Sequence, residues 1–499
     1  MLPTQSHSYL ISGLIIISMM LVIIAAPGSC YAMSLLTLPL ENEFNITRTT
    51  SSSLISFRIT TEFICTGLFA FVFKKLSLKK WIVAGIILFV AGTYSASYAE
   101  EFTHVALTFG MLSAFGSGIL YGCIQYSIPE YFPTSVSSVT GIVFSGMGSG
   151  GILWGMLLEK LTASVSWRFA LSSISIYIAL LCVPILLIPA PLPLPIQNTT
   201  KGTTGGKTEA DKTCDVTTAD EKAEQCSMKI SKDDKDKDQD KNQDGYIDPK
   251  ITLLQALMTK QIITLALAYC LFLIAALGIF GHLAAFYTIA FSSSEAAMIV
   301  SIVAIAQIIG RPLFGVLADR LFGNCVTLAF CSLHVGLSLL CWTSSGTSLE
   351  IGIIWALNFG ISFGGYWAVV AGAVHENMPD EYFAKGFGII VVVAGLPGTM
   401  FSSSIFGYLK ETTGTYMTPS ILSASLLLVG TVVVLVGGDV GCHCCTKSTT
   451  SPNKVMQVEN EILTVVQATA CESESLCDDD EISISVHFSN DVVEKQDGV

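Results

Sequence analysis

Long apolar runs separated by short polar turns form the dominant pattern of this chain. Eleven of these runs follow a first run at about 10–40, and they lie near 50–73, 81–99, 103–128, 136–160, 167–190, 261–290, 293–318, 322–343, 348–374, 384–409 and 417–437. Most approach the ~20 residues that a helix needs to cross ~30 Å of hydrocarbon. Backbone groups in lipid must be satisfied within the segment, so the pattern predicts helices that span a membrane. The first run is longer than the apolar part of a signal peptide, and no basic region precedes it.

Composition supports this interpretation and adds a domain plan. Of the 499 residues, 51% are hydrophobic and 13% are charged. The charge is concentrated in 201–250 and 450–499, which predicts disorder there. We therefore expect an all-α membrane protein with two six-helix bundles, at 1–190 and 255–437. A cytoplasmic linker at 191–254 joins the bundles, and an acidic cytoplasmic tail follows at 438–499.

Charge and cysteine usage narrow the function classes. The net charge of −13 owes much to the acidic tail, so it gives no reason to expect a nucleic-acid partner. The fifteen cysteines are scattered and form no framework of paired spacings, which favours a reduced setting. The lipid bilayer is the partner that the composition does predict.

The two halves of the chain repeat each other. Gly118-Ile-Leu-Tyr-Gly122 in the fourth run is matched by Gly360-Ile-Ser-Phe-Gly364 in the tenth. A Glu-Tyr-Phe sequence precedes both the fifth run and the eleventh. Matches in the same order favour two parallel repeats, as found in some transporter folds.

Basic residues in short loops predict the orientation of the chain. Lys74, Lys75, Lys79 and Lys80 lie between the second and third runs, and the 201–250 segment is rich in lysine. Such residues favour the cytoplasmic side, which also places both termini in the cytoplasm. We expect a multi-pass protein of the plasma membrane.

One stretch, at 310–320, carries most of the functional signal. It begins with Gly310-Arg311-Pro312 and continues as Gly-Val-Leu-Ala-Asp-Arg at 315–320. The second part resembles the loop signature of the major facilitator superfamily. With Tyr31-Ala32 in the first run and Trp167-Arg168 in the sixth, the stretch resembles the monocarboxylate transporter family and its oxalate/formate exchanger relatives. The resemblance implies secondary transport of a small organic anion by alternating access. It also implies symport, and a single-span accessory glycoprotein as a partner.

Two positions depart from the proton-linked lactate carriers of that family. Those carriers place a lysine shortly after the Tyr-Ala pair, where this chain has Leu35. They also place an aspartate one turn before the arginine, where this chain has Gln307. A glutamine cannot exchange a proton, so the departures argue against simple proton-coupled lactate symport.

Arg311 is the principal candidate for substrate binding. An arginine inside an apolar segment is expensive in lipid, so it should face protein or water. Its planar guanidinium matches a carboxylate, which favours a substrate anchor. The alternative is a structural arginine that pairs with a helix-end carbonyl or with an acid such as Glu130. Gln307 lies four residues before Arg311, on the same helix face and within hydrogen-bonding reach.

Asp319 and Arg320 are candidates for gating. The resemblance implies that the loop acid pairs with neighbouring helix ends and steadies the outward-facing state. A charge at a helix terminus makes this physically reasonable. The alternative is a purely structural turn.

Four further residues complete the candidate site. Arg58 and Glu62 are four residues apart in the second run, and a structural ion pair is the favoured interpretation. The alternative makes Glu62 the proton-coupling group that replaces the missing aspartate. By resemblance, Tyr31 and His282 line the substrate cavity.

The polar segments hold separate hypotheses. Asp240 to Asp248 fits the first nine positions of a calcium loop, but position twelve is not the usual glutamate, so solvated charge is favoured. We expect palmitoylation at Cys442, Cys444 and Cys445, in preference to zinc binding with a neighbouring histidine. The C-terminal Asp-Gly-Val is a candidate ligand for a PDZ-type domain.

The sequence shows no catalytic triad, metal cage or phosphate-cradling loop, so we expect neither enzymatic activity nor a cofactor. Two alternatives to organic-anion transport remain. One is a non-transporting nutrient sensor built on the transporter fold. The other is a carrier of a different substrate, such as aromatic amino acids.

Overall fold

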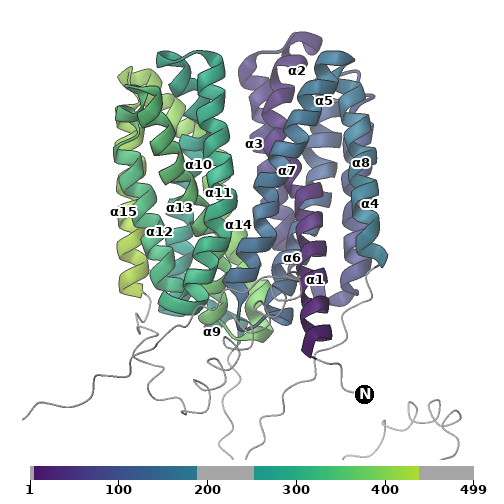
Figure 1. The fold of residues 1–499 in the computed structure, drawn as a ribbon, viewed down its shortest axis with the longest axis vertical. Helices are drawn as coiled ribbons and strands as arrows, with labels where there is room; N and C mark the ends of the chain where they lie inside the picture. The colour runs from purple at the N-terminus through teal and green to yellow at the C-terminus, as the bar shows by residue number, and fades with distance from the viewer. Residues whose placement is uncertain (1–4, 188–251, 438–499) are drawn as a thin grey trace, which may run out of the picture.

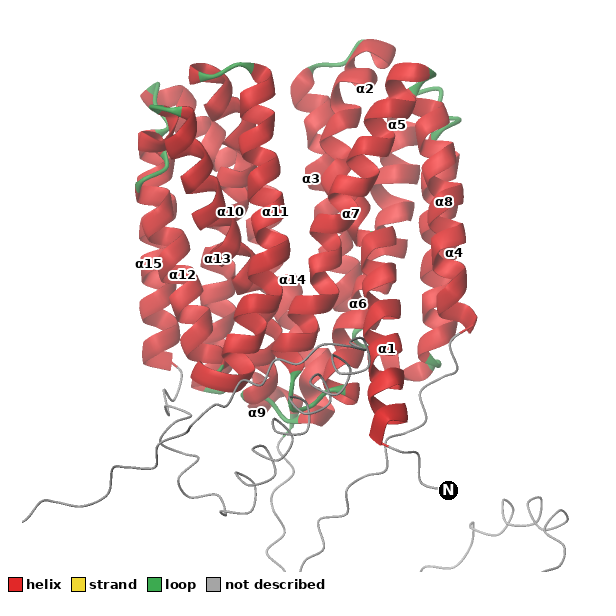
Figure 2. Ribbon diagram, in the orientation of Figure 1, coloured by secondary structure: helices red, strands yellow, loops and turns green. Residues whose placement is uncertain are grey.

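The structure is a computed structural model that describes residues 5–187 and 252–437. Within these ranges every regular element is a helix (Figure 2). The hypotheses for the linker and the tail, including the calcium-loop pattern, the three cysteines and the PDZ ligand, lie outside the described residues.

The elements of the N-terminal part are α1 (Gln5–Ala25), η1 (Pro27–Leu36), α2 (Thr37–Phe44), α3 (Arg48–Phe69), η2 (Phe73–Lys75), α4 (Leu78–Ala96), α5 (Phe102–Val105), η3 (Ala106–Leu112), α6 (Ser113–Tyr131), α7 (Val136–Ser164) and α8 (Trp167–Leu187). Those of the C-terminal part are α9 (Leu253–Leu257), α10 (Lys260–Ala290), α11 (Ser293–Leu317), η4 (Ala318–Phe322), α12 (Asn324–Leu340), η5 (Thr343–Gly346), α13 (Leu349–Glu376), α14 (Asp380–Thr413) and α15 (Met417–Gly437).

The helices have the length and composition of membrane spans. In the described ranges, nine helical segments are long and apolar enough to cross a bilayer, and two shorter apolar helices occur at Trp167–Cys182 and Asn324–Leu340. Many large apolar side chains on these helices are exposed, such as Ile87, Leu180 and Val393. Exposed apolar side chains suit helices whose outer faces meet lipid.

The helices form two groups that stand side by side (Figure 1). We call α1–α8 the N-half and α9–α15 the C-half. In the view of Figure 1 the lower end carries the start of α1 and α9, and the upper end carries α2 and α5. The halves are joined by α7, which packs on α11 and α13, and by α3, which packs on α14. The interface between these helices is where the candidate residues meet.

The first apolar run is not the single helix that the sequence predicts. Helix α1 ends at Ala25, and the chain continues as the 3₁₀ segment η1 and the short helix α2. Pro27 has no backbone N–H to continue the α-helix. A Cβ on the next residue, Gly28, would lie 3.0 Å from the Cα of Gly150 in α7, so the break brings two backbones into close contact. Tyr31 therefore lies in η1 and not in an α-helix.

The matched glycines of the two repeats occupy equivalent places. A Cβ on Gly118 would lie 2.8 Å from the carbonyl oxygen of Glu62, so α6 packs on α3 at this point. A Cβ on Gly360 would lie 2.6 Å from the carbonyl oxygen of Val303, so α13 packs on α11 in the same manner. Small residues allow helix backbones to approach closely, as in many membrane-helix contacts. The geometry supports the internal repeat that the sequence predicts.

Candidate functional site

Arg311 lies at the interface between the two halves. The side chain belongs to α11 and is only 2% exposed. Its Nη1 donates a hydrogen bond across the interface to the backbone carbonyl of Phe144 in α7. The backbones are also close, since a Cβ on Gly141 would lie 2.3 Å from the Arg311 carbonyl oxygen. Glycine-rich sequence in α7 lets the guanidinium reach a main-chain acceptor.

One acceptor of Arg311 is a carbonyl within α7, which the sequence does not predict. The sequence alternatives were a helix-end carbonyl and an acid such as Glu130. Glu130 instead forms an ion pair of 3.6 Å with Lys74, within the N-half. Gly141 and Gly148 of α7 lie against α11, whereas Gly146 and Gly150 lie against α1 and η1, so the glycines of α7 serve two different contacts.

Gln307 lies one helical turn from Arg311 toward the upper end. Its side chain is 2% exposed, and neither the amide nitrogen nor the amide oxygen has a hydrogen-bond partner in the described part of the chain. The predicted hydrogen bond between Gln307 and Arg311 is therefore wrong. Residues four apart share a face but need suitable rotamers to bond. A buried amide without partners costs about 1–3 kcal/mol, so the position suits a group that binds a polar ligand.

Asp319 crosses the interface at the lower end. Its carboxylate accepts hydrogen bonds from the backbone N–H groups of Ser137, at 3.3 Å, and Ser138, at 2.6 Å. These amides belong to the first turn of α7, where no intrahelical acceptor is available. Ser135 precedes the helix but makes no side-chain cap. Asp319 of the C-half thus caps a helix of the N-half.

A second polar contact joins the halves beside this cap. The hydroxyl of Ser137 donates to the side-chain oxygen of Asn324 in α12, at 2.5 Å. The amide nitrogen of Asn324 donates to the carboxylate of Glu376 in α13, at 2.6 Å. Sequence reasoning missed these three residues, because they come from three helices that are far apart in the chain.

Arg320 does not join this contact. Its side chain is exposed, and among the described residues it forms no ion pair within 4 Å. The short π-helical segment η4 carries both residues and ends at Gly323, whose φ of 82° is readily available to glycine. The structure brings Asp319, but not Arg320, to the interface.

Arg58 and Glu62 lie inside the N-half. Both are buried, with 1% and 7% exposure. The Arg58 guanidinium donates to the carbonyl of Phe109, at 3.0 Å, and to the hydroxyl of Ser113. It also lies 4.8 Å from the centre of the Phe109 ring. The acceptors belong to the π-helical segment η3 and the start of α6, so Arg58 holds three elements together.

The structure places His282 in a different group of side chains. The ring lies 6.1 Å from that of Tyr416, and a Cβ on Gly407 would lie 3.6 Å from its Cε1. Phe286 and Trp342 also pack against Tyr416. His282 is thus part of an aromatic cluster, separate from the contacts that Arg311 makes.

An aromatic row on α13 was not predicted from the sequence. Trp355, Phe359, Phe363 and Trp367 follow at intervals of four, and their rings lie 4.8–6.3 Å apart along the row. Phe363 and Trp367 of the row pack on Phe272 of α10, whereas Gly364 of the same helix contacts the backbone of Gln307 on α11. The indole N–H of Trp367 is buried and has no partner among the described residues.

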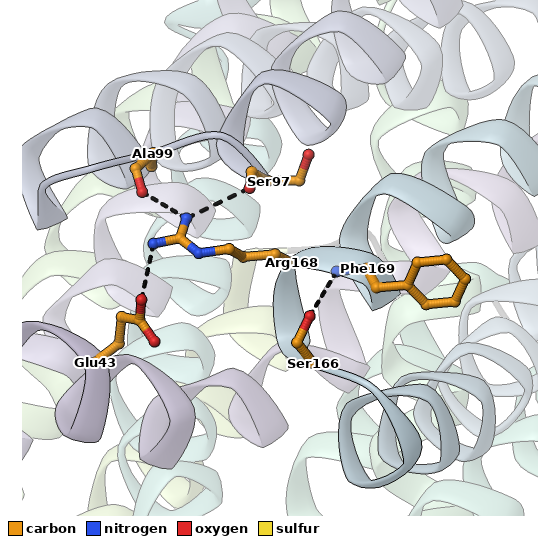
Figure 3. A network of polar contacts seen from close by, with 6 residues as sticks. All are labelled: Glu43, Ser97, Ala99, Ser166, Arg168 and Phe169. Carbon is orange, nitrogen blue, oxygen red and sulfur yellow. Dashed lines mark hydrogen bonds and ion pairs between the residues drawn. The ribbon is translucent and has the colours of Figure 1, made fainter.

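Arg168, of the Trp167-Arg168 pair, stabilises the upper end of the N-half through the polar contacts shown in Figure 3. Arg168 binds the Glu43 carboxylate at 3.0 Å, and it donates to the carbonyls of Ala99 and Ser97 at 2.5 and 3.4 Å. These bonds connect α8 with α2 and with the segment after α4. The geometry gives the pair a structural role.

Comparison with known proteins agrees with the fold. A family model described as Major Facilitator Superfamily matches residues 13–402 and 263–440. The chain therefore belongs to the major facilitator superfamily and is a multi-pass membrane protein. Among the described residues no group of His, Cys, Asp and Glu could hold a metal ion.

The similar proteins are transporters and not enzymes. The agnestins efflux protein AgnL12 of Paecilomyces divaricatus is 24% identical, with 76% of each chain covered. Monocarboxylate transporter 12 of Homo sapiens is 22% identical, with 74% of this chain and 69% of that protein covered. The proton:xylose symporter XylE shares the fold, with a TM-score of 0.59 and 13% identity over 84% of this chain and 95% of that chain.

Proposed function

We propose that this protein is a secondary active transporter that moves a small organic anion, a monocarboxylate or a related carboxylate, by alternating access. The observation that carries the proposal is Arg311, a buried guanidinium at the interface of the two halves. Beside it, Gln307 offers a buried amide with no partner in the described chain. A guanidinium and an amide together can bind both oxygens of a carboxylate.

The proposed architecture has twelve spans in two bundles. Within residues 5–187 and 252–437, nine helical segments meet the length and hydropathy of a membrane helix. We propose three further spans, which bring the total to twelve. They are α3, whose mean hydropathy is lowered by Arg58 and Glu62, and the two shorter helices α8 and α12. With the lower end in the cytoplasm of a plasma-membrane protein, the lysines between α3 and α4 face inward, as positive residues do.

In the proposed cycle the lower end closes and opens as the halves rock. The close approaches between the halves involve α7 at 137–148 and α11 at 304–315. Asp319 and Ser137 hold this end closed, and they must separate before it opens. The Arg311–Phe144 bond lies on the same interface, so the motion that opens the lower end also frees the guanidinium. Substrate binding and gating are thereby linked through α11.

Uptake into proteoliposomes tests the proposal, with labelled pyruvate, lactate, aromatic amino acids and dicarboxylates. Arg311→Ala should abolish uptake of the transported solute, and Arg311→Lys should retain little, because lysine lacks the planar fork. Lys160→Ala removes an exposed cation on α7 and serves as the control. Undiminished uptake by Arg311→Ala would remove this residue from the site. Absence of uptake for every solute in wild-type protein would favour a non-transporting sensor.

The aromatic row on α13 favours a second substrate class, the aromatic amino acids. Trp367 and Phe363 lie within one turn of Gly364, which contacts Gln307. Aromatic rings recognise flat apolar groups by stacking. Competition of unlabelled phenylalanine against labelled lactate distinguishes the classes, and Trp367→Leu should weaken only the aromatic solute.

A further inference from the structure

Helix α13 turns one of its faces toward the surrounding membrane. The helix packs on α11 and on α12 (Figure 1). Its aromatic row meets α10, since the ring of Phe363 lies 5.7 Å from that of Phe272. The exposed residues of its upper half lie on the opposite side of the helix, away from α10. These residues, which we call the outer face of α13, are Ile351, Ile354, Leu357 and Asn358.

Exposed apolar side chains of the two neighbouring helices flank the outer face of α13. On α11 they are Ile305, Ile309 and Leu313, and on α12 they are Phe330, Leu333 and Leu337. Large apolar side chains that remain exposed on membrane-spanning helices suit contact with lipid or with another apolar helix. The outer face of α13 is therefore the centre of a wider apolar surface of the C-half.

Asn358 is the polar exception within this surface, and it lies deep in the membrane. The middle of the 28-residue helix α13 is between Ser362 and Phe363, so Asn358 lies about 7 Å from it. Hydrocarbon extends about 15 Å on each side of the middle of a bilayer. The Asn358 side chain is exposed and makes no hydrogen bond within the described part of the chain. The other exposed carboxamides among the described residues occur in the short end segments, at Asn42, Asn45 and Gln255.

His334 of α12 adds a second polar group next to Asn358. Its Nδ1 lies 2.7 Å from Oγ of Ser362, which is one helical turn from Asn358 on α13. The ring is partly exposed and stacks on Phe330, with 6.0 Å between the ring centres. Its Nε2 makes no hydrogen bond within residues 5–187 and 252–437. A serine hydroxyl can donate or accept, so Nε2 can act as either an acceptor or a donor.

The depth of these groups determines what can bind them. Lipid headgroups lie in the outer layers of the bilayer, and water is absent from its core, so neither reaches Asn358. A polar side chain at this depth is satisfied by a polar group on another helix. A carboxamide both donates and accepts, so it can form two hydrogen bonds with its own copy across a two-fold axis. A second copy of the chain supplies the matching group at the matching depth by symmetry.

We propose that the outer face of α13 binds a second copy of the chain in a two-fold symmetric dimer. The two Asn358 carboxamides hydrogen-bond to each other, and the exposed apolar side chains of α11, α12 and α13 pack around them. The two His334 rings lie beside this pair, where one Nε2 donates and the other accepts. The described contacts between the N-half and the C-half do not involve Asn358 or His334, so each copy keeps its own transport site. The inference is independent of the proposed transport function.

Energy transfer between donor-labelled and acceptor-labelled copies of the full chain in liposomes tests the dimer. Measured over a series of protein-to-lipid ratios, it gives the dissociation constant of the dimer. Asn358→Leu should raise this constant about tenfold or more, because both hydrogen bonds across the axis are lost. His334→Phe, which keeps an aromatic ring, should raise it by a smaller factor. Asn358→Gln keeps a carboxamide and should retain most of the affinity.

Ser425→Leu is the matched control. Ser425 is an exposed polar residue of another helix, α15, and its hydroxyl already donates to the Ile421 carbonyl at 2.8 Å. Leucine at this position should therefore leave the dissociation constant unchanged. The leucine variants replace exposed residues, so they should elute in size-exclusion chromatography as wild-type protein does.

Transfer no greater than random proximity gives, at every ratio in wild-type protein, would overturn the inference. An equal dissociation constant in wild type, Asn358→Leu and His334→Phe would also overturn it, because the dimer would then use another surface. Monomeric wild-type protein that retains a smaller membrane protein, released by Asn358→Leu, would assign the surface to a foreign helix and reject the second copy. Solute uptake by the same samples is a separate measurement. Dimers without uptake would support this inference and contradict the transport proposal, and uptake by monomers would do the reverse.

Discussion

Asp319→Asn is the substitution that tests the closed lower end most directly. The side chain of asparagine has nearly the same shape, so packing around η4 should survive. The change removes the negative charge that faces the first turn of α7, where Ser137 and Ser138 donate their backbone N–H groups. In asparagine an NH₂ group replaces one of the two carboxylate oxygens. This donor would face a backbone N–H, which is also a donor, so the hydrogen bond there is lost.

The structure gives the size of the effect. The bond to Ser138 is short, at 2.6 Å, and the bond to Ser137 is long, at 3.3 Å, so one strong charge-assisted bond is lost. Bonds of this type contribute about 1.5–3 kcal/mol. Asp319 is only partly buried, so the lower part of that range, about 1.5–2 kcal/mol, applies. Because about 1.4 kcal/mol corresponds to a factor of ten, the ratio of lower-open to lower-closed molecules should rise about 10- to 30-fold.

Single-molecule energy transfer can measure this ratio. Dyes attached through unnatural amino acids at Lys80 and Glu381 would report on the lower end, since both positions are exposed and lie on different halves. Glu130→Gln is the matched control. It removes a carboxylate at the same end, but the ion pair it breaks, with Lys74, lies within the N-half. An exposed pair of this kind contributes about 0–1 kcal/mol.

A ratio that changes less than about twofold in Asp319→Asn, in protein that elutes as wild type does, would refute the reasoning. It would mean that the contact between Ser137 and Asn324, or the apolar packing of α7 on α11, holds the lower end closed without the cap. An equal shift in Glu130→Gln would also contradict it, because the effect would then follow from charge in general.

Three other predictions concern packing, the upper end and the substrate site. Gly310→Ala should sharply reduce the yield of folded protein, because the new Cβ would lie 2.0 Å from the Ile361 carbonyl oxygen. Gly13→Ala is the control, since a Cβ there would have nothing within 4 Å. The yield of each variant in size-exclusion chromatography measures the difference. Arg168→Ala should destabilise the N-half by about 1–3 kcal/mol through its lost bonds, measured as a lower Tm in detergent. Gln307→Asp should weaken lactate uptake about tenfold at neutral pH, because the new carboxylate competes with the lactate carboxylate for Arg311. Uptake should recover on acidification, since protonation removes the charge of the new aspartate. A flat pH profile in that variant would contradict the pairing.

The sequence predicted the helices well, because each depends on a local apolar run. It failed where neighbouring helices determine the local structure. The helix of the first run ends before Pro27 and Gly28. Gly28 lies against the backbone of α7, so the close packing of these two segments compensates for the interrupted helix. The segments η3 and η4 are π-helical, and no pattern in the sequence predicted that departure. Each lies where a polar group, Arg58 or Asp319, joins another helix.

The sequence by itself determined the membrane class, the internal repeat and the buried arginine of α11, since apolar length and a rare intramembrane charge are local properties of the chain. Only the tertiary structure decided what those charges contact. Arg311 meets a carbonyl of α7, Asp319 caps α7, and Gln307 is buried without a partner in the described chain. These outcomes depend on which helices pack together and on how closely their backbones approach. Both are determined by glycine contacts between helices that are distant in sequence.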